Sequence, residues 1–134
     1  AKTIADLRPY KLGAQVGTTG YDYITKVIHS DQTPNVYNTT NDALQALKNG
    51  QVDGIVVDYP TAYYMANVQL DNGHIVGQFP APPGNAEHFS FVLAKGSALT
   101  ACVNKALSTL RSNGTLSQIQ QKWLSAAAGA PVLK

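Results

Sequence analysis

Short apolar runs alternate with helix-like patterns along this chain, and the alternation is the feature that most restricts its fold. Residues 11–16, 34–39, 53–58, 74–79 and 89–96 have the length and composition of strands, and helical spacing of apolar residues separates most of them. Parallel strands need a long crossover between them, usually a helix. We therefore expect an α/β fold of three layers, with a mostly parallel sheet of about five strands and helices on both faces.

Composition narrows the functional classes. The chain has 134 residues, of which 44% are hydrophobic, so one domain with a real core is expected. Only 13% are charged and the net charge is +2, which argues against disorder and against a basic surface for nucleic acid. No run of about 18 apolar residues indicates a membrane span. The low charge, with polarity supplied by Thr, Asn, Gln and Ser, favours a secreted or periplasmic protein.

The helix over residues 40–49 has recognisable ends. Thr39 and Asp42 have the spacing of a capping box, with a shorter acid than usual at its second position. Gly50 suits the left-handed residue that follows a helix. The next helix is expected to begin near Pro60, because proline fits the first helical turn.

The C-terminal part has the clearest helical pattern. Apolar residues recur at helical spacing over 99–110, and Cys102 on this stripe is predicted to be a core residue. Thr115 and Gln118 have the spacing of a second capping box, at the start of a last helix. Residues 125–134 are expected to form a frayed tail.

Polar residues follow two of the predicted strands. The turn over residues 17–20, with Thr18 and Thr19, follows the first strand, and Asp58 follows the third. In parallel sheets, ligands bind beyond the carboxyl ends of the strands. The turn offers backbone N–H groups and hydroxyls to an anion, unless a threonine only caps the helix. Asp58 suits a cationic group, or else it caps the Pro60 helix. Both alternatives stay open, but together they outline a receptor for an α-amino acid.

No pattern indicates catalysis or a metal site. The histidines at positions 29, 74 and 88 have no metal-ligand spacing to other His, Cys or acidic residues, and no nucleophile motif is present. The single cysteine cannot form an internal disulfide. The sequence therefore predicts a binding protein rather than an enzyme, with no cofactor and no metal.

Three blocks of sequence resemble the bacterial extracytoplasmic solute-binding proteins of the polar amino acid type, which deliver amino acids to the permeases of ABC importers. These blocks read LGAQVGTTGYDYI, ALQALKNGQVDGIVVDYPTAYY and NKALSTLRSNGTLSQIQQKWL. The third, with its helix, Asn-Gly, T-x-x-Q and tryptophan, is the most specific combination. The resemblance implies one flavodoxin-like lobe of a two-lobed periplasmic binding protein.

The resemblance also implies a domain organisation. Residues 1–87 correspond to the second lobe, residues 88–124 to a strand and two helices that return to the first lobe, and residues 125–134 to the tail. The N-terminal portion of the family, which forms most of the first lobe, has no counterpart. Its arginine for the α-carboxylate of the ligand is therefore missing, because neither Arg8 nor Arg111 matches that position.

Four residues match binding positions of the family. Thr19 resembles the second-lobe residue that contacts the α-carboxylate of the ligand, and Thr18 lies in the same turn. Asp58 resembles the acid that pairs with the α-ammonium group. Gln15 matches a pocket-lining position that varies with specificity. The resemblance implies that these residues bind a polar amino acid.

The resemblance has further implications. The expected partner is the membrane permease of an ABC importer, and the expected location is periplasmic or extracellular, with lipid anchoring at the cell surface as an option for a full-length protein. A homodimer or a segment-swapped dimer is expected as well, because the C-terminal apolar stripe lacks its usual cover. The alternatives within the same resemblance are the sensing lobe of a receptor or sensor kinase and a periplasmic dehydratase.

Overall fold

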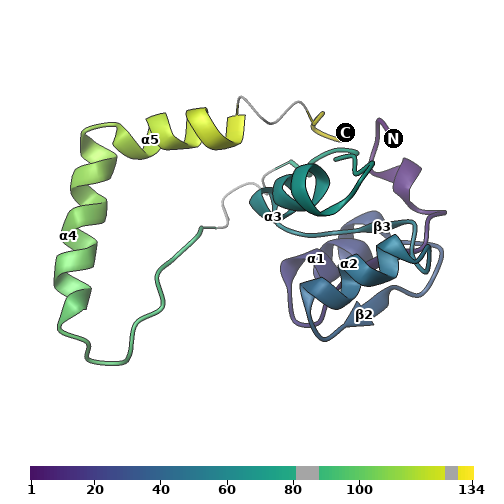
Figure 1. The fold of residues 1–134 in the computed structure, drawn as a ribbon, viewed down its shortest axis with the longest axis horizontal. Coiled ribbons are helices and arrows are strands. Elements are labelled where there is room, and N and C mark those ends of the chain that lie inside the picture. The colour runs from purple at the N-terminus through teal and green to yellow at the C-terminus, as the bar shows by residue number, and fades with distance from the viewer. Residues whose placement is uncertain (81–87, 126–129) are drawn as a thin grey trace. The chain divides into compact units, whose positions relative to one another are not determined.

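The computed structural model describes residues 1–80, 88–125 and 130–134, with the side chains of residues 124 and 125 left out. The chain divides into two compact units. Unit 1 is formed by residues 1–80 and 130–134, and unit 2 by residues 81–129. Unit 1 contains the sheet, whereas unit 2 contains two helices and a preceding irregular segment (Figure 1). The domain boundaries expected after residues 87 and 124 stay predictions.

Unit 1 is built on three parallel strands in the order β2–β1–β3. The central strand β1 spans Leu12–Gln15, and its neighbours are β2 over Asn35–Tyr37 and β3 over Gly54–Ile55. All three coincide with runs that the sequence predicts to be strands. The α/β class and the parallel sheet are therefore confirmed.

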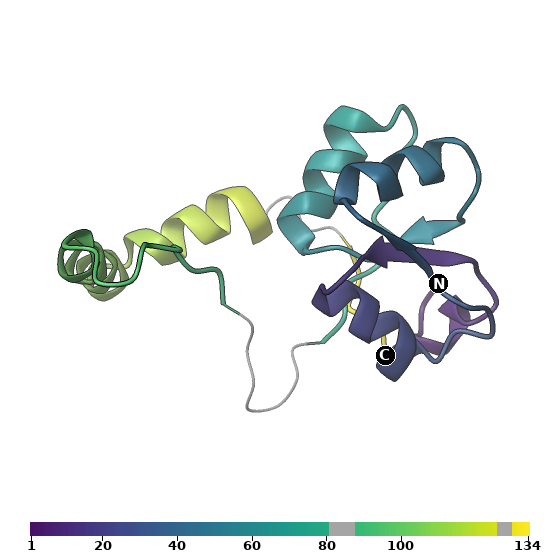
Figure 2. The same ribbon diagram turned by 90° about the horizontal axis from the view of Figure 1, so that it is seen from below.

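Helices connect these strands and cover the sheet. A short 3₁₀ turn, Ala5–Leu7, precedes β1. Helix α1 spans Thr19–Tyr23, α2 spans Thr40–Lys48 and α3 spans Tyr59–Tyr64. Wider helical turns extend two of them, α1 through Ile24–Ile28 and α3 through Met65–Gln69. Figure 2 shows α1 and α2 on opposite faces of the sheet, as right-handed crossovers require when β2 and β3 flank β1 on opposite sides.

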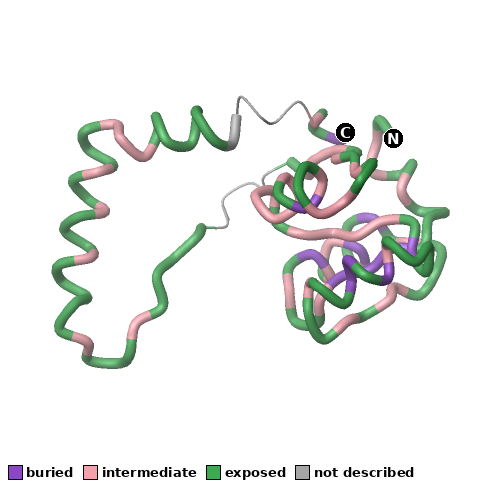
Figure 3. The backbone as a smooth tube through the Cα atoms, in the orientation of Figure 1, coloured by how far each residue is buried: buried purple, intermediate pink, exposed green. Residues whose placement is uncertain are grey.

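The buried residues of the described chain all lie in unit 1 (Figure 3). One cluster joins Leu12 and Ala14 of β1 to Ile24 and Ile28 of the α1 region. Each fully buried isoleucine contributes about 1.5–3 kcal/mol to folding. Further buried apolar side chains come from α2, from the segment that follows it and from the turn that extends α3, at Ala43, Leu44, Ala46, Val52 and Met65.

The end of the chain is not frayed. Leu133 is only 2% exposed, and its backbone N–H donates to the carbonyl of Gln78 at 2.9 Å. The N–H of Ile4 donates to the carbonyl of Lys134 at the same distance. The expectation of a frayed tail is therefore wrong for residues 130–134, because a buried leucine and backbone hydrogen bonds hold them. The rest of the predicted tail lies largely outside the described residues.

Two predicted strands do not join the sheet. In segment 74–79, Gln78 forms only an isolated parallel bridge to Val132, while the Phe79 ring packs on Tyr23 with centroids 4.7 Å apart. Segment 89–96 has no strand partner among the described residues. A strand persists only where a neighbour satisfies its N–H and C=O groups. The described sheet consequently has three strands rather than about five.

Unit 2 consists mainly of helices whose apolar side chains are exposed. Helix α4 spans Leu99–Ser112, and α5 spans Thr115–Gln120 with an extending turn over Gln121–Ser125. Cys102 is exposed, so its prediction as a core residue is wrong. The helical spacing was correct, but no other element of the described part of unit 2 covers Cys102. We call the following exposed side chains the apolar surface of unit 2: Phe89, Phe91, Val92, Leu99, Ile119 and Trp123.

The two predicted capping boxes have different outcomes. The first is confirmed, since the N–H of Asp42 donates to the Thr39 hydroxyl and the N–H of Thr39 donates to the Asp42 carboxylate, both at 3.1 Å. The second is wrong. Gly114, at φ 79°, occupies the N-cap position of α5, and the N–H of Thr115 donates to the side-chain oxygen of Asn113 at 3.0 Å. Helix α5 therefore begins without a hydroxyl cap.

Candidate ligand-binding site

The predicted site residues follow the carboxyl ends of two hydrogen-bonded strands. The chain leaves β1 through α1 and enters β2 on one side, while β3 pairs with the other side of β1. The strand order therefore reverses between β1 and β3. Such a switch point leaves a crevice outside the sheet, where ligands of open α/β folds bind. We refer to this place as the carboxyl edge.

The turn after β1 is held by a threonine hydroxyl. Thr18 occupies the N-cap position of α1 with an extended backbone, but its side chain makes no capping bond. Instead, its Oγ1 donates to the backbone carbonyl of Gln15 at 2.8 Å. Thr19, the first residue of α1, is exposed at the surface. The hydroxyl proton of Thr18 thus stabilises the turn, and Thr19 is left accessible.

Gly20 brings this turn against the end of β3. Its Cα lies so close to Val56 that an added Cβ would clash with the Val56 carbonyl oxygen and lie 3.1 Å from the carbonyl carbon. Only glycine fits this approach between two backbones. The start of α1 therefore packs directly on the segment that leads from β3 to Asp58.

Asp58 occupies the N-cap position of α3 but caps only with its backbone. Its carbonyl accepts from the N–H of Ala62 at 2.9 Å, and its side chain makes no capping hydrogen bond. The carboxylate is exposed and has no hydrogen bond or ion pair within the described residues. The side-chain cap considered from the sequence does not form, so this charge is available to a cation.

Gln15 is joined to the start of α2 by a hydrogen bond that sequence reasoning missed. The hydroxyl of Thr40 donates to the Oε1 atom of Gln15 at 2.6 Å, and the pair is partly buried. Thr40 directly follows the capping residue Thr39, so the capping box was a signal for where α2 begins. Nothing in the sequence indicated that the side chain after the cap would reach β1, because this contact joins residues 25 positions apart.

Tyr59, next to Asp58, has a raised pKa. Partial burial raises the pKa of the Tyr59 phenol, and neighbouring Tyr63 raises it further. The phenol therefore stays neutral at physiological pH and adds no charge beside Asp58. Within the described residues, no group of three or more His, Cys, Asp or Glu side chains is placed to hold a metal ion.

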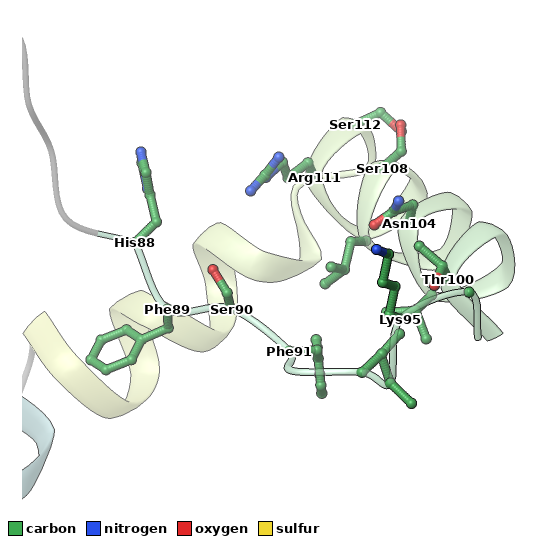
Figure 4. A pocket seen from close by; sticks show the side chains of 15 residues that line it. His88, Phe89, Ser90, Phe91, Lys95, Thr100, Asn104, Ser108, Arg111 and Ser112 are labelled. Carbon is green, nitrogen blue, oxygen red and sulfur yellow. The ribbon is translucent and has the colours of Figure 1, made fainter. Parts of the chain in front are cut away.

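Unit 2 has an open hollow of about 1000 Å³ between segment 88–96 and α4 (Figure 4). Lys95 and Arg111 contribute cationic groups to its lining, and Phe91 contributes an aromatic ring. None of the predicted site residues lines it. Its lining residues come from this irregular segment and α4, and two of them, Phe89 and Phe91, belong to the apolar surface of unit 2.

The sequence and the structure are similar to those of amino acid receptors. No family model matches the chain. It is 30% identical over 131 residues to the ABC transporter arginine-binding protein 1 of Escherichia coli strain K12. Among solved structures, an ancestral arginine-binding protein bound to glutamine is similar with a TM-score of 0.65 and 28% identity. A substrate-binding protein of an ABC uptake transporter from Streptococcus pneumoniae, with bound histidine, has a TM-score of 0.54 and 25% identity.

These similarities extend over most of this chain but only part of each relative. The match covers 91% of the chain and 50% of the Escherichia coli protein. For the two structures it covers 92% and 93% of the chain, against 54% and 53% of theirs. The chain therefore spans about half the length of the relatives it matches. Their names confirm the resemblance to amino acid solute-binding proteins of ABC transporters that three sequence blocks predicted. No helix of the described residues has the length and apolarity that a membrane crossing requires.

Proposed function

We propose that this chain is an amino-acid-binding lobe of a solute-binding protein of the ABC importer type, and that the ligand binds at the carboxyl edge. One observation carries the proposal beyond the similarity itself. The Thr18–Thr19 turn and the free Asp58 carboxylate follow adjacent parallel strands, at the point where the strand order reverses. A group that accepts hydrogen bonds and a group that donates them are thus both available to a zwitterion.

Each residue has a stated role in this proposal. Asp58 accepts hydrogen bonds from the α-ammonium group, and its charge strengthens them. Thr19 donates to the α-carboxylate through its backbone N–H and its exposed hydroxyl. Thr18 shapes the turn, because its hydroxyl proton is committed to the carbonyl of Gln15. Gln15 lines the side-chain end of the site.

The expected affinity of the chain alone is low. Charge-assisted hydrogen bonds contribute about 1.5–3 kcal/mol each when shielded from water, and less in an open site. Fixing a free ligand costs at least about 4 kcal/mol. When this cost is set against the hydrogen bonds, the expected dissociation constant is in the millimolar range or weaker. A millimolar dissociation constant corresponds to a binding free energy of about 4 kcal/mol.

The proposed biological setting follows the relatives. We propose a membrane permease of an ABC importer as partner, a periplasmic or extracellular location, optionally with lipid anchoring, and a binding rather than a catalytic role. Cell fractionation tests the location, since recovery of the protein in the cytoplasmic fraction would contradict it. Copurification with a permease of the polar amino acid type tests the partner.

We further propose that a second copy covers the apolar surface of unit 2, in a homodimer or by exchange of the segment. Val92 is 95% exposed and Trp123 is 62% exposed, and large uncovered apolar patches mark interaction surfaces. Light scattering across a concentration series should show a dimer, with Cys102 protected from thiol reagents as the dimer forms. A monomer at every concentration, with Cys102 equally reactive throughout, would rule the dimer out.

A nuclear magnetic resonance titration tests the binding site. We expect L-amino acids at millimolar concentration to shift the amide signals of residues 15–20 and 56–59 in the ¹⁵N-labelled chain. Asp58→Asn keeps the shape of the side chain but removes its charge, so it should weaken binding by up to about tenfold, because a charge-assisted hydrogen bond in an open site contributes less than its shielded strength. Asp71→Asn, at another exposed acid, is the matched control and should leave binding unchanged. Equal binding by the two variants would refute the role of Asp58.

A further inference from the structure

Both carbonyl oxygens of Gln15, that of the backbone and that of the side chain, accept a hydrogen bond from a threonine hydroxyl. Thr18 donates to the backbone carbonyl at 2.8 Å, and Thr40 donates to the side-chain carbonyl at 2.6 Å. Both contacts are partly buried, and Gln15 is the last residue of β1. Its backbone and its side-chain amide are therefore positioned by two different helix starts, those of α1 and α2.

The contact with Thr40 determines which end of the amide remains available. A carboxamide has one acceptor oxygen and two N–H donors. Since Oε1 accepts the hydroxyl proton of Thr40, the Nε2 group is the end of the Gln15 amide that is left to bind another partner. No hydrogen bond of Nε2 occurs within the described residues. Thr40 is itself well placed, because the Thr39–Asp42 capping box fixes the first turn of α2.

We propose that Thr40 is a positioning residue which orients the Gln15 amide, and that this pair selects amino acids whose side chain ends in a hydrogen-bond acceptor. An amide carbonyl or a carboxylate accepts from Nε2. The guanidinium of arginine and the ammonium of lysine carry only donors, so they face the two N–H groups without a partner. The inference rests on the proposed binding of an amino acid at the carboxyl edge, and it adds the class of ligand that this edge prefers.

The expected preference is modest because the site is open to water. A single net hydrogen bond changes an equilibrium by about fivefold to tenfold. Glutamine should therefore bind about five to ten times more tightly than arginine. This preference for glutamine should disappear when the Gln15 amide is free to rotate, because it can then turn either its oxygen or its nitrogen toward the ligand.

The experiment compares L-glutamine with L-arginine hydrochloride, each titrated at equal ionic strength into the complete ¹⁵N-labelled chain. In the unsubstituted chain we expect the five- to tenfold preference for glutamine, with a shift of the Gln15 side-chain amide signals. Thr40→Val removes the hydroxyl at nearly constant shape and should bring the ratio close to one. Thr40→Ser restores the donor and should restore the ratio. Gln15→Glu offers only acceptors and should reverse the preference toward arginine.

A matched control and two contrary outcomes complete the test. Thr109→Val makes the same change within α4, where the hydroxyl donates to the Lys105 carbonyl at 3.0 Å, and should leave the ratio unchanged. A preference for arginine in the unsubstituted chain, or a ratio that Thr40→Val does not alter, would overturn the inference while leaving amino acid binding intact. Absence of any shift at the carboxyl edge with either ligand would overturn both the inference and the proposed function.

Discussion

Replacing Leu133 by alanine tests whether the last residues of the chain belong to the core of unit 1. The side chain is 2% exposed, and an added Cβ on Gly77 would lie only 2.6 Å from its Cγ atom, so leucine packs directly on this backbone. Replacing a buried leucine by alanine costs about 2–5 kcal/mol. Only a few backbone hydrogen bonds hold the segment that carries Leu133, so it can shift partly into the space, and we expect about 2–3 kcal/mol.

That loss is large for a unit of this size. A change of 1 kcal/mol shifts the midpoint of thermal unfolding by about 4–8 °C in domains of 60–100 residues. Leu133→Ala should therefore lower the midpoint of unit 1 by about 10–20 °C. All seven tyrosines lie in unit 1, whereas the single tryptophan lies in unit 2. Near-ultraviolet circular dichroism of tyrosine consequently reports on the unit that contains Leu133.

The neighbouring residue provides the control for this measurement. Val132 is 55% exposed, so Val132→Ala should shift the midpoint by only a few degrees. The two variants remove similar apolar groups at adjacent positions, and only their burial differs. If both variants unfolded at nearly the same temperature, the tail would be frayed, as the sequence suggested, and the packing argument would be refuted.

Three further predictions concern local structure. Gly20→Ala should destabilise unit 1 by about 1–3 kcal/mol in urea, because the new methyl group meets the backbone at the end of β3; a more stable variant would show that no clash exists. The pKa of Asp6 is lowered to about 2, mainly because its carboxylate accepts a hydrogen bond from the backbone N–H of Lys2. The stabilisation that the ionised Asp6 carboxylate gives to the fold should therefore be present above pH 3.8 and be lost as the pH falls toward 2. A titration of this carboxyl group by nuclear magnetic resonance with a midpoint near 3.8 would contradict the prediction. Thr39→Ala should cost about 1 kcal/mol through loss of a helix cap, whereas Thr115→Ala should leave the helix content by circular dichroism unchanged, and equal effects would disprove the difference between the two caps.

The candidate site shows the limit of sequence reasoning at single residues. Spacing identified the Thr18–Thr19 turn and Asp58, and the structure places them after adjacent strands. It left open whether these side chains cap helices, and that question depends on side-chain geometry. In the structure, Thr18 bonds back to Gln15 and the Asp58 carboxylate caps nothing. Thr40 was missed because its partner lies on another element, and no local pattern encodes such a contact.

What the sequence determined by itself is local. Hydrophobic periodicity predicted all three strands of the sheet, and the spacing of Thr39 and Asp42 predicted the start of α2. These signals can be found in the sequence because each depends on only a few neighbouring residues. The tertiary structure decided whatever requires a neighbour. Segment 89–96 has strand composition but no partner strand among the described residues, Cys102 lies on an apolar stripe yet is exposed, and Leu133 is buried although it lies in a tail that was expected to fray. The pairing of a strand and the burial of a side chain each need two contacting surfaces, and the sequence pattern of one segment specifies only its own surface.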